Sequence, residues 1–285
     1  MSTAETTILS SVAQTLLIPL YIRAAESQRP DALIRDDQAV ARVQRLGTAP
    51  AWFPRMQVDE DNRVAIVLRN RQIDRWTRDF VAKSGQAAVV HIGCGLDSRF
   101  ERVDNGQVEW YDLDLPEVIA LRRKLLGGEG PRYHLLACSA LDPSWMEAVR
   151  TGSPRRFLFV AEGVLMYLDR AQVKWLVLAL QRRFPGAELI ADTFSPFMVW
   201  ANNLRYSRTG IGARCQWGLK RGRDLEAWDD GIKLLDEWYP FSRSEPRLAR
   251  ARWVRHIPFF ARVIGVFRYL FNPADRRPGP TPGAN

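Results

Sequence analysis

Short apolar runs alternate with amphipathic stretches over the middle of the chain, from about residue 87 to residue 192. The apolar runs predict five strands, at 87–92, 108–113, 132–137, 156–161 and 187–192. The segments between them predict helices, at 98–102, 116–126, 143–150 and 169–183. Strands that alternate with helices are typical of an α/β fold, in which helices cover both faces of a mostly parallel sheet. The uninterrupted apolar run 157–161 suits a central strand that is buried on both faces.

The segments on either side of this region follow other patterns. Residues 6–46 have a helical pattern with a polar break near Arg29 and Pro30, and residues 60–84 place apolar side chains at helical spacing. The stretch after Asp192 is rich in Trp, Arg, Asn and Gly, and two late strands are predicted beyond it, at 232–239 and 263–271. We therefore divide the chain into a helical cap, a ligand-binding core, an inserted lid, two strands that complete the core and a disordered tail, at 1–84, 85–193, 194–231, 232–272 and 273–285.

Composition narrows the classes of function. The chain of 285 residues carries a net charge of +9, which we interpret as a solvated basic surface rather than a nucleic-acid footprint, although Trp253 stands among arginines. No apolar run reaches the roughly 18 residues that a membrane-spanning helix needs, and the first residues show no signal-peptide pattern. Cys94, Cys138 and Cys215 are too far apart in sequence to indicate a disulfide framework or a metal site. We expect no nucleic-acid, membrane or metal partner, and a reducing, cytoplasmic setting.

A Gly-x-Gly turn closes the first predicted strand. Gly93 and Gly95 follow that strand directly, and Asp114 ends the second strand nineteen residues after Gly95. Glycines let a backbone approach a ligand closely, and a carboxylate at this position accepts hydrogen bonds from ribose hydroxyls. Ser98 replaces the third glycine of the dinucleotide fingerprint, which argues against NAD or FAD and is compatible with S-adenosylmethionine, a nucleoside cofactor without phosphate. Asp112 shares a strand face with Asp114, but Asp114 comes last and is the better ribose acceptor.

Further polar residues stand where strands end. Ser139 and Leu141 follow the third strand and are predicted at the adenine edge, although Ser139 fits a turn cap equally well. Glu162 ends the fourth strand and is predicted to face the ammonium or sulfonium side of the cofactor. On the helix before the sheet, Arg69 or Arg71 is placed to pair with a carboxylate of the cofactor. No histidine stands in a nucleophile motif, so no catalytic residue or base is predicted.

Five motifs in order resemble the leucine carboxyl methyltransferase family, in particular its bacterial branch of tetracenomycin-type polyketide O-methyltransferases. They are the stretches 15–39, 68–74, 93–99, 114–117 and 161–168. The resemblance extends over about residues 10–271. It implies a class I methyltransferase fold, which is Rossmann-like with a mostly parallel seven-stranded sheet, N-terminal helices and a helical lid insertion, and it implies S-adenosyl-L-methionine as the cofactor.

The resemblance also implies roles for individual residues. By family position, Arg69 holds the methionyl carboxylate, Asp114 holds the ribose and Glu162 lies near the methionine end. The predicted cofactor-binding residues are Arg69, Gly93, Gly95, Asp114, Leu115, Ser139, Ala140, Leu141 and Glu162. The predicted residues of the substrate pocket are Tyr167, Trp200, Asn203 and Tyr206.

The predicted reaction is a direct displacement that moves a methyl group from the sulfonium to an oxygen of a small acid or phenol of secondary metabolism, such as a polyketide. A carboxylate is ionised at pH 7 and needs no base, whereas a phenol with a pKa near 10 needs one. The lack of a candidate base and the basic surface therefore favour a carboxylate. The alternatives are N-methyl or other group transfer from the same cofactor, and a non-catalytic scaffold that retains the fold.

Overall fold

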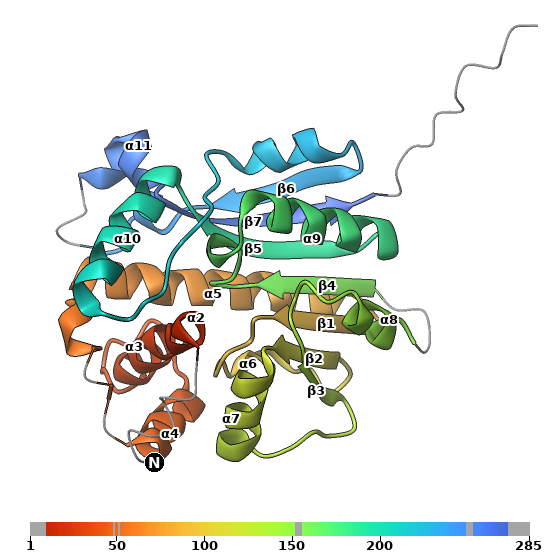
Figure 1. Cartoon of the computed structure of the whole chain (residues 1–285), viewed down its shortest axis with the longest axis horizontal. Coiled ribbons are helices and arrows are strands. Elements are labelled where there is room, and N and C mark those ends of the chain that lie inside the picture. Colours follow the sequence, from red (N-terminus) through yellow and green to blue (C-terminus); the bar gives the residue numbers. More distant parts are fainter. Residues whose placement is uncertain (1–9, 48, 51, 152–155, 249–252, 273–285) are drawn as a thin grey trace, which may run out of the picture.

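The computed structural model describes residues 10–47, 49–50, 52–151, 156–248 and 253–272. In this part of the chain the strands are β1 (Ala87–Ile92), β2 (Glu109–Asp114), β3 (Tyr133–Ala137), β4 (Arg156–Ala161), β5 (Glu188–Phe194), β6 (Ile232–Trp238) and β7 (Ile264–Phe271). They form one sheet in the order β3-β2-β1-β4-β5-β7-β6 (Figure 1). The first five strands are parallel, and β7 runs antiparallel to both β5 and β6. The predicted α/β fold with a mostly parallel, seven-stranded sheet is confirmed.

Helices cover both faces of the central strands because side chains alternate along each strand. Along β1, Ala87 and Val89 belong to one apolar cluster, and Val90 and Ile92 belong to the cluster on the opposite face. Every residue of β1 is buried, which explains why all of them except His91 are apolar. The helices that cover the first face are α5 (Glu60–Lys83) and α6 (Arg99–Val103), and those on the second are α8 (Ser144–Arg150) and α9 (Arg170–Arg183).

The N-terminal helices lie at the edge where the parallel strands end (Figure 1). The predicted helical stretch is found as α2 (Ser11–Gln14), α3 (Leu17–Ser27) and α4 (Asp37–Leu46), and its first residues lie outside the described part of the chain. Asp36 begins α4 as a cap, since its side chain accepts a hydrogen bond from the backbone N–H of Ala39 (2.9 Å). An apolar cluster joins α3 and α4 to α7 (Pro116–Leu126). These helices are therefore packed onto the core, over the strand ends.

The segment predicted as a lid begins with α10 (Pro196–Thr209), continues without regular structure and ends in the 3₁₀ helix η3 (Gly222–Trp228). The remaining short helices are η1 (Pro54–Met56), η2 (Leu165–Tyr167), η4 (Pro240–Ser242), η5 (Val254–His256) and α11 (Pro258–Ala261). The division of the chain into a cap, a core and a lid stays a prediction, and the predicted tail 273–285 lies outside the described residues. Among the helices that the structure places, none has the length and hydropathy that crossing a bilayer requires.

Candidate functional site

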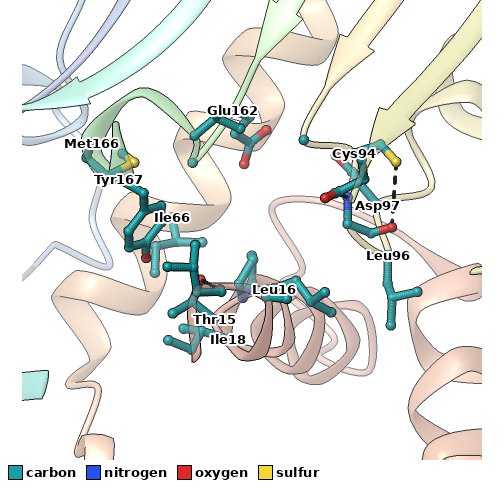
Figure 2. Close-up of a pocket in the computed structure, with 18 of the residues that line it drawn as sticks. Thr15, Leu16, Ile18, Ile66, Cys94, Leu96, Asp97, Glu162, Met166 and Tyr167 are labelled. Atoms are coloured by element: carbon teal, nitrogen blue, oxygen red, sulfur yellow. Dashed lines mark hydrogen bonds between the residues drawn. The ribbon is translucent and has the colours of Figure 1, made fainter. Parts of the chain in front are cut away.

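A cavity of about 290 Å³ opens at the carboxyl ends of the parallel strands, between β1 and β4. The order of the strands reverses at this point, and open α/β sheets bind their ligands in the crevice that results. Figure 2 shows Glu162 and Cys94 from the strand ends around the same space as Thr15, Leu16 and Ile18 from the N-terminal helices. The N-terminal helices, the core and α10 all contribute to the lining of the cavity.

The turn after β1 requires its glycines. Gly93 and Gly95 both have positive φ, of 66° and 50°, a region that residues with a Cβ adopt at a cost. A Cβ on Gly93 would also stand 2.2 Å from Cγ2 of Val164, and one on Gly95 would stand 3.2 Å from Cβ of Leu16. The turn is thus packed between the loop after β4 and the start of α3, and it presents backbone to the cavity.

Asp114 ends β2 beside this turn. The backbone N–H of Gly95 donates to its Oδ2 (2.7 Å), and the N–H of Leu115 donates to its Oδ1 (2.7 Å). Burial raises the pKa of Asp114, and the two amide hydrogen bonds oppose that rise. A carboxylate has about four acceptor sites, so two remain for the hydroxyls of a ligand. Asp114, Leu115, Gly93 and Gly95 all line the cavity, and their role in binding a nucleoside stays a prediction.

Asp112, two residues earlier on β2, belongs to the core rather than the cavity. Its carboxylate pairs with Arg122 of α7 and accepts hydrogen bonds from Trp110 Nε1 (2.7 Å) and the Tyr133 hydroxyl (2.6 Å). Burial would raise the pKa of Asp112, but Arg122, His91 and Tyr133 together outweigh burial and the pKa falls to about 2. Arg122 in turn donates to the carbonyl of Gly95 (2.9 Å). Arg122 therefore connects the carboxylate of Asp112 to the backbone of the glycine turn.

Glu162 lies at the end of β4 and is buried among cations. Its Oε1 accepts from Arg69 Nη2 (2.6 Å) and Asn70 Nδ2 (2.8 Å), and its Oε2 pairs with Arg99. Burial would raise the pKa of Glu162, but the two guanidinium groups lower it to about 2. Glu162 lines the cavity as predicted, yet these partners already occupy its carboxylate. These ion pairs connect α5 and α6 to the end of β4.

Arg69 is the cation that the sequence places nearest the methionine end. Its Nη1 donates to Oδ2 of Asp192 (2.7 Å) and its Nη2 donates to Glu162, whereas its buried Nε has no partner among the described residues. Arg69 lines the cavity, so this Nε–H is a donor that a ligand carboxylate can use. Arg71, the alternative candidate, is exposed and does not line the cavity.

A second buried network was missed by sequence reasoning. Arg23 of α3 pairs with Asp36 (3.0 Å) and lies 3.6 Å from Asp97, and Arg102 of α6 bridges the same two carboxylates. Ser98 donates to Asp36. The signal for it was present in the 15–39 and 93–99 motifs, which supply four of these residues, but nothing in the sequence said that the two motifs meet. The network fixes α3 above the glycine turn.

The wall that faces away from the strand ends is built by α10 and η2. Tyr167 and Tyr206 line it, with their hydroxyl oxygens 3.0 Å apart, and burial raises the pKa of Tyr167 to about 12. Asn202 and Arg205 also line it. Arg205 is half-buried and forms no ion pair with any described carboxylate. Met166 of η2 and Met198 of α10 add apolar side chains, and the cavity is also lined by Ile18, Met56, Ile66 and Phe194 from other elements.

The remaining predicted residues divide into two groups. Ser139 and Ala140 line the cavity, whereas Leu141 is half-buried beside it and does not. Trp200 and Asn203 also do not line it, because they border a separate depression on the other side of α10. The amide of Asn203 instead holds the backbone of Cys215, accepting from its N–H (2.8 Å) and donating to its carbonyl (2.9 Å). No group of His, Cys, Asp and Glu among the described residues is arranged to hold a metal ion.

Comparison with known proteins agrees with this geometry. The sequence model of the family described as leucine carboxyl methyltransferase matches residues 17–181. The tetracenomycin polyketide synthesis O-methyltransferase of Streptomyces glaucescens is 30% identical over 276 residues, which cover 94% of this chain and 99% of that one. An S-adenosyl-L-methionine-dependent methyltransferase of Gibberella zeae is 25% identical over 81% of this chain and 83% of its own. A solved structure from Thermobifida fusca, described as that of a methyltransferase, shares the fold with a TM-score of 0.56, at 14% identity over 88% of this chain and 94% of that one.

Proposed function

The chain belongs to the leucine carboxyl methyltransferase family and is an S-adenosylmethionine-dependent methyltransferase, and we propose that it methylates a carboxylate oxygen of a small, polyketide-like acid. Two questions follow from membership of the family. The first is which residues hold the cofactor, and the second is what chemistry the rest of the cavity offers to an acceptor.

The strand-end half of the cavity fits S-adenosylmethionine. When bound, the cofactor supplies a methyl group on a sulfonium. The fit rests on three features: the glycine turn that a Cβ would fill, the two unused acceptor sites of Asp114, and the unpartnered Nε–H of Arg69. We assign the ribose to Asp114, the methionyl carboxylate to Arg69, and the adenine edge to Leu115, Ser139 and Ala140. Glu162 serves this half by holding Arg69 in place.

The observation that carries the acceptor assignment is the unpaired Arg205. Three arginines line the cavity, and Arg23 and Arg69 are each paired with protein carboxylates. Arg205 is free to pair with a ligand, and a half-buried guanidinium beside an amide and two hydroxyls is a typical carboxylate or phenolate anchor. The apolar side chains around it suit a ring system. An aromatic acid of the size of a polyketide therefore matches both the charge and the lining.

The titratable groups of the cavity also favour a carboxylate. Asp97 and Glu162 are held by arginines, and burial raises the pKa of Tyr167 and Tyr206 far above neutrality. None of these four groups is a good proton acceptor near pH 7. His91 also lines the cavity, but its Nε2 lies 3.2 Å from Nη1 of Arg99 and its Nδ1 lies 3.5 Å from Oδ1 of Asp112, so both ring nitrogens face buried side chains. An acceptor carboxylate needs no proton removed, so positioning and exclusion of water are sufficient for attack. A phenol is the second candidate, since the named relative is an O-methyltransferase of polyketide synthesis.

The decisive experiment follows the methyl group. The full chain is incubated with S-adenosylmethionine labelled in the methyl group and a panel of aromatic acids, phenols and amines, and the products are then treated with mild alkali. A methyl ester releases the label as methanol, whereas an aryl methyl ether or an N-methyl amine keeps it. Volatile label from the acid panel supports the proposal. Label that survives alkali in phenol or amine products overturns it.

A further inference from the structure

Several aromatic side chains on the outer side of α10 and on the neighbouring α11 are exposed to solvent and do not belong to the core. Trp200, Trp253 and Phe259 are 62%, 58% and 59% exposed. Phe197 links them, with its ring centroid 5.9 Å from that of Trp200 and 5.5 Å from that of Phe259. Leu204, Ile257 and Phe260 are also exposed, and α10 and α11 lie side by side at one corner of the molecule (Figure 1, upper left). We call these seven residues the aromatic patch.

Exposed arginines accompany this patch. Residues 193–223 and 253–272, which carry the patch, contain nine basic residues and neither Asp nor Glu. The whole chain has 41 basic and 32 acidic residues, so the remainder holds 32 of each. Arg208, Arg255 and Arg262 are exposed on these segments and form no ion pair with a described carboxylate. Of the nine, Arg221 pairs with Asp224 and Arg268 pairs with Glu188, so the exposed rings share these segments with three exposed arginines that no described carboxylate pairs.

Exposed rings and unpaired arginines without any acid match one kind of partner. We propose that the aromatic patch docks on the surface of an anionic lipid bilayer, with its rings at the level of the headgroups and its arginines on lipid phosphates. Tryptophan and phenylalanine settle in the interfacial region of bilayers, and each nearby basic residue adds attraction to anionic lipid. Isolated exposed apolar residues are ordinary, but a contiguous patch of this kind marks an interaction surface.

The charge distribution argues against the two other occupants. A second copy of the chain would bring its own Arg208, Arg255 and Arg262 against those already there, which is unfavourable at short range. An acidic protein could pair with the arginines, but its charge would not account for the cluster of exposed aromatic rings. The position of α10 adds a functional argument, because its inner face lines the cavity with Met198 and Tyr206. Docking of the outer face of α10 would hold the cavity next to the lipid bilayer, in which apolar molecules are concentrated.

The test is cosedimentation of the full chain with vesicles, without acceptor, so that its result does not depend on the proposed function. Vesicles of phosphatidylcholine are compared with vesicles that also contain phosphatidylglycerol, at low and high salt. We expect binding to the anionic vesicles at low salt, with an apparent affinity at least about tenfold weaker on phosphatidylcholine alone or at high salt. The double variant Trp253→Ser/Phe259→Ser should lose at least about tenfold in affinity.

The control removes other exposed apolar side chains elsewhere. Trp175 on α9 and Leu235 on β6 are exposed and lie outside the patch. The Trp175→Ser/Leu235→Ser variant should bind vesicles as the unchanged protein does, and both double variants should keep the thermal unfolding midpoint and the affinity for S-adenosylmethionine. The proposal is overturned if the unchanged protein ignores anionic vesicles at low salt. It is also overturned if both variants lose binding equally, or if the patch variant instead dissociates a dimer seen by sedimentation velocity.

Discussion

Nη2 of Arg69 lies 2.6 Å from Oε1 of Glu162, although 93 residues separate them in the chain. The same guanidinium donates to Asp192 at 2.7 Å, so one arginine of α5 ties together the ends of β4 and β5. A buried ion pair that loses one partner leaves a charge without compensation, which costs about 3–5 kcal/mol. The ion pairs of Arg69 with Glu162 and Asp192 therefore form only in the folded chain, and the structure of the cavity depends on them.

This dependence predicts a loss of stability in acid. The pKa values of Glu162 and Asp112 are about 2 in the folded protein, below the 4.5 and 3.8 that are usual for these residues. Their stabilisation is fully present above the pKa of the unfolded chain and is lost as the pH falls from about 4.5 towards 2. The raised pKa of buried Asp192 acts in the opposite sense. Urea unfolding at a series of pH values should show the fall.

The variant Glu162→Gln isolates one contribution to that fall. Because it keeps the shape and removes the charge, we expect it to unfold with about 3 kcal/mol less free energy at neutral pH and to show a flatter profile below pH 4.5. A profile as steep as that of the unchanged protein would mean that other carboxylates carry the acid sensitivity.

The Gly93 turn offers a comparison between two glycines. Gly93→Ala should suffer both from φ of 66° and from a Cβ only 2.2 Å from Val164. Gly163→Ala is the matched control, since its φ is 69° and no atom stands within 4 Å of its added Cβ. The control should cost about 1–2 kcal/mol of unfolding free energy, and Gly93→Ala distinctly more. Adding Val164→Ala to Gly93→Ala should restore part of the difference, and the idea of a steric cause fails if it restores none.

Much of this architecture was accessible from the sequence, and for a definite reason. The predicted strand 87–92 is β1, and 156–161 is β4, because buried parallel strands are apolar at most positions and are bounded by turns. The late strands 232–239 and 263–271 were found within one residue at each end as β6 and β7. Local pattern is sufficient where burial of the strand itself decides the structure.

The ion-pair partners were not accessible in this way. Arg69 meets Asp192 across 123 residues, and Arg99 meets Glu162 across 63, in a chain whose arginines are too numerous for spacing to select between them. The predicted role of Trp200 in the substrate pocket rested on its place in the inserted segment. The side of α10 that faces the cavity is set by the packing of Met198 and Tyr206, and Trp200 lies on the other side.

Asp114 should control affinity for the cofactor, both as an acceptor and because its carboxylate holds the backbone N–H groups of Gly95 and Leu115. Asp114→Ala removes two acceptors from the proposed ribose site, and each lost hydrogen bond to a charged group is worth about 1.5–3 kcal/mol. We expect calorimetry to show S-adenosylmethionine binding weakened by about tenfold or more. Asp142→Asn, an exposed carboxylate outside the cavity, is the matched control and should bind normally. Unchanged affinity in Asp114→Ala would remove the ribose assignment.

Arg205 separates binding of the acceptor from binding of the cofactor. If its guanidinium anchors the acceptor carboxylate, Arg205→Ala should raise the KM for the acid found in the labelling panel by about tenfold or more, because a charge-assisted pair in a half-buried site is lost. The Kd for S-adenosylmethionine should stay the same, since the strand-end half of the cavity is untouched. Arg208→Ala, one helical turn later and exposed, is the control and should leave both constants unchanged.

Arg205→Lys keeps the charge but loses the forked donors, so it should recover only part of the affinity. A KM unaffected by Arg205→Ala would mean that the acceptor's charge lies elsewhere in the cavity, and the case for a carboxylate would lose its main support.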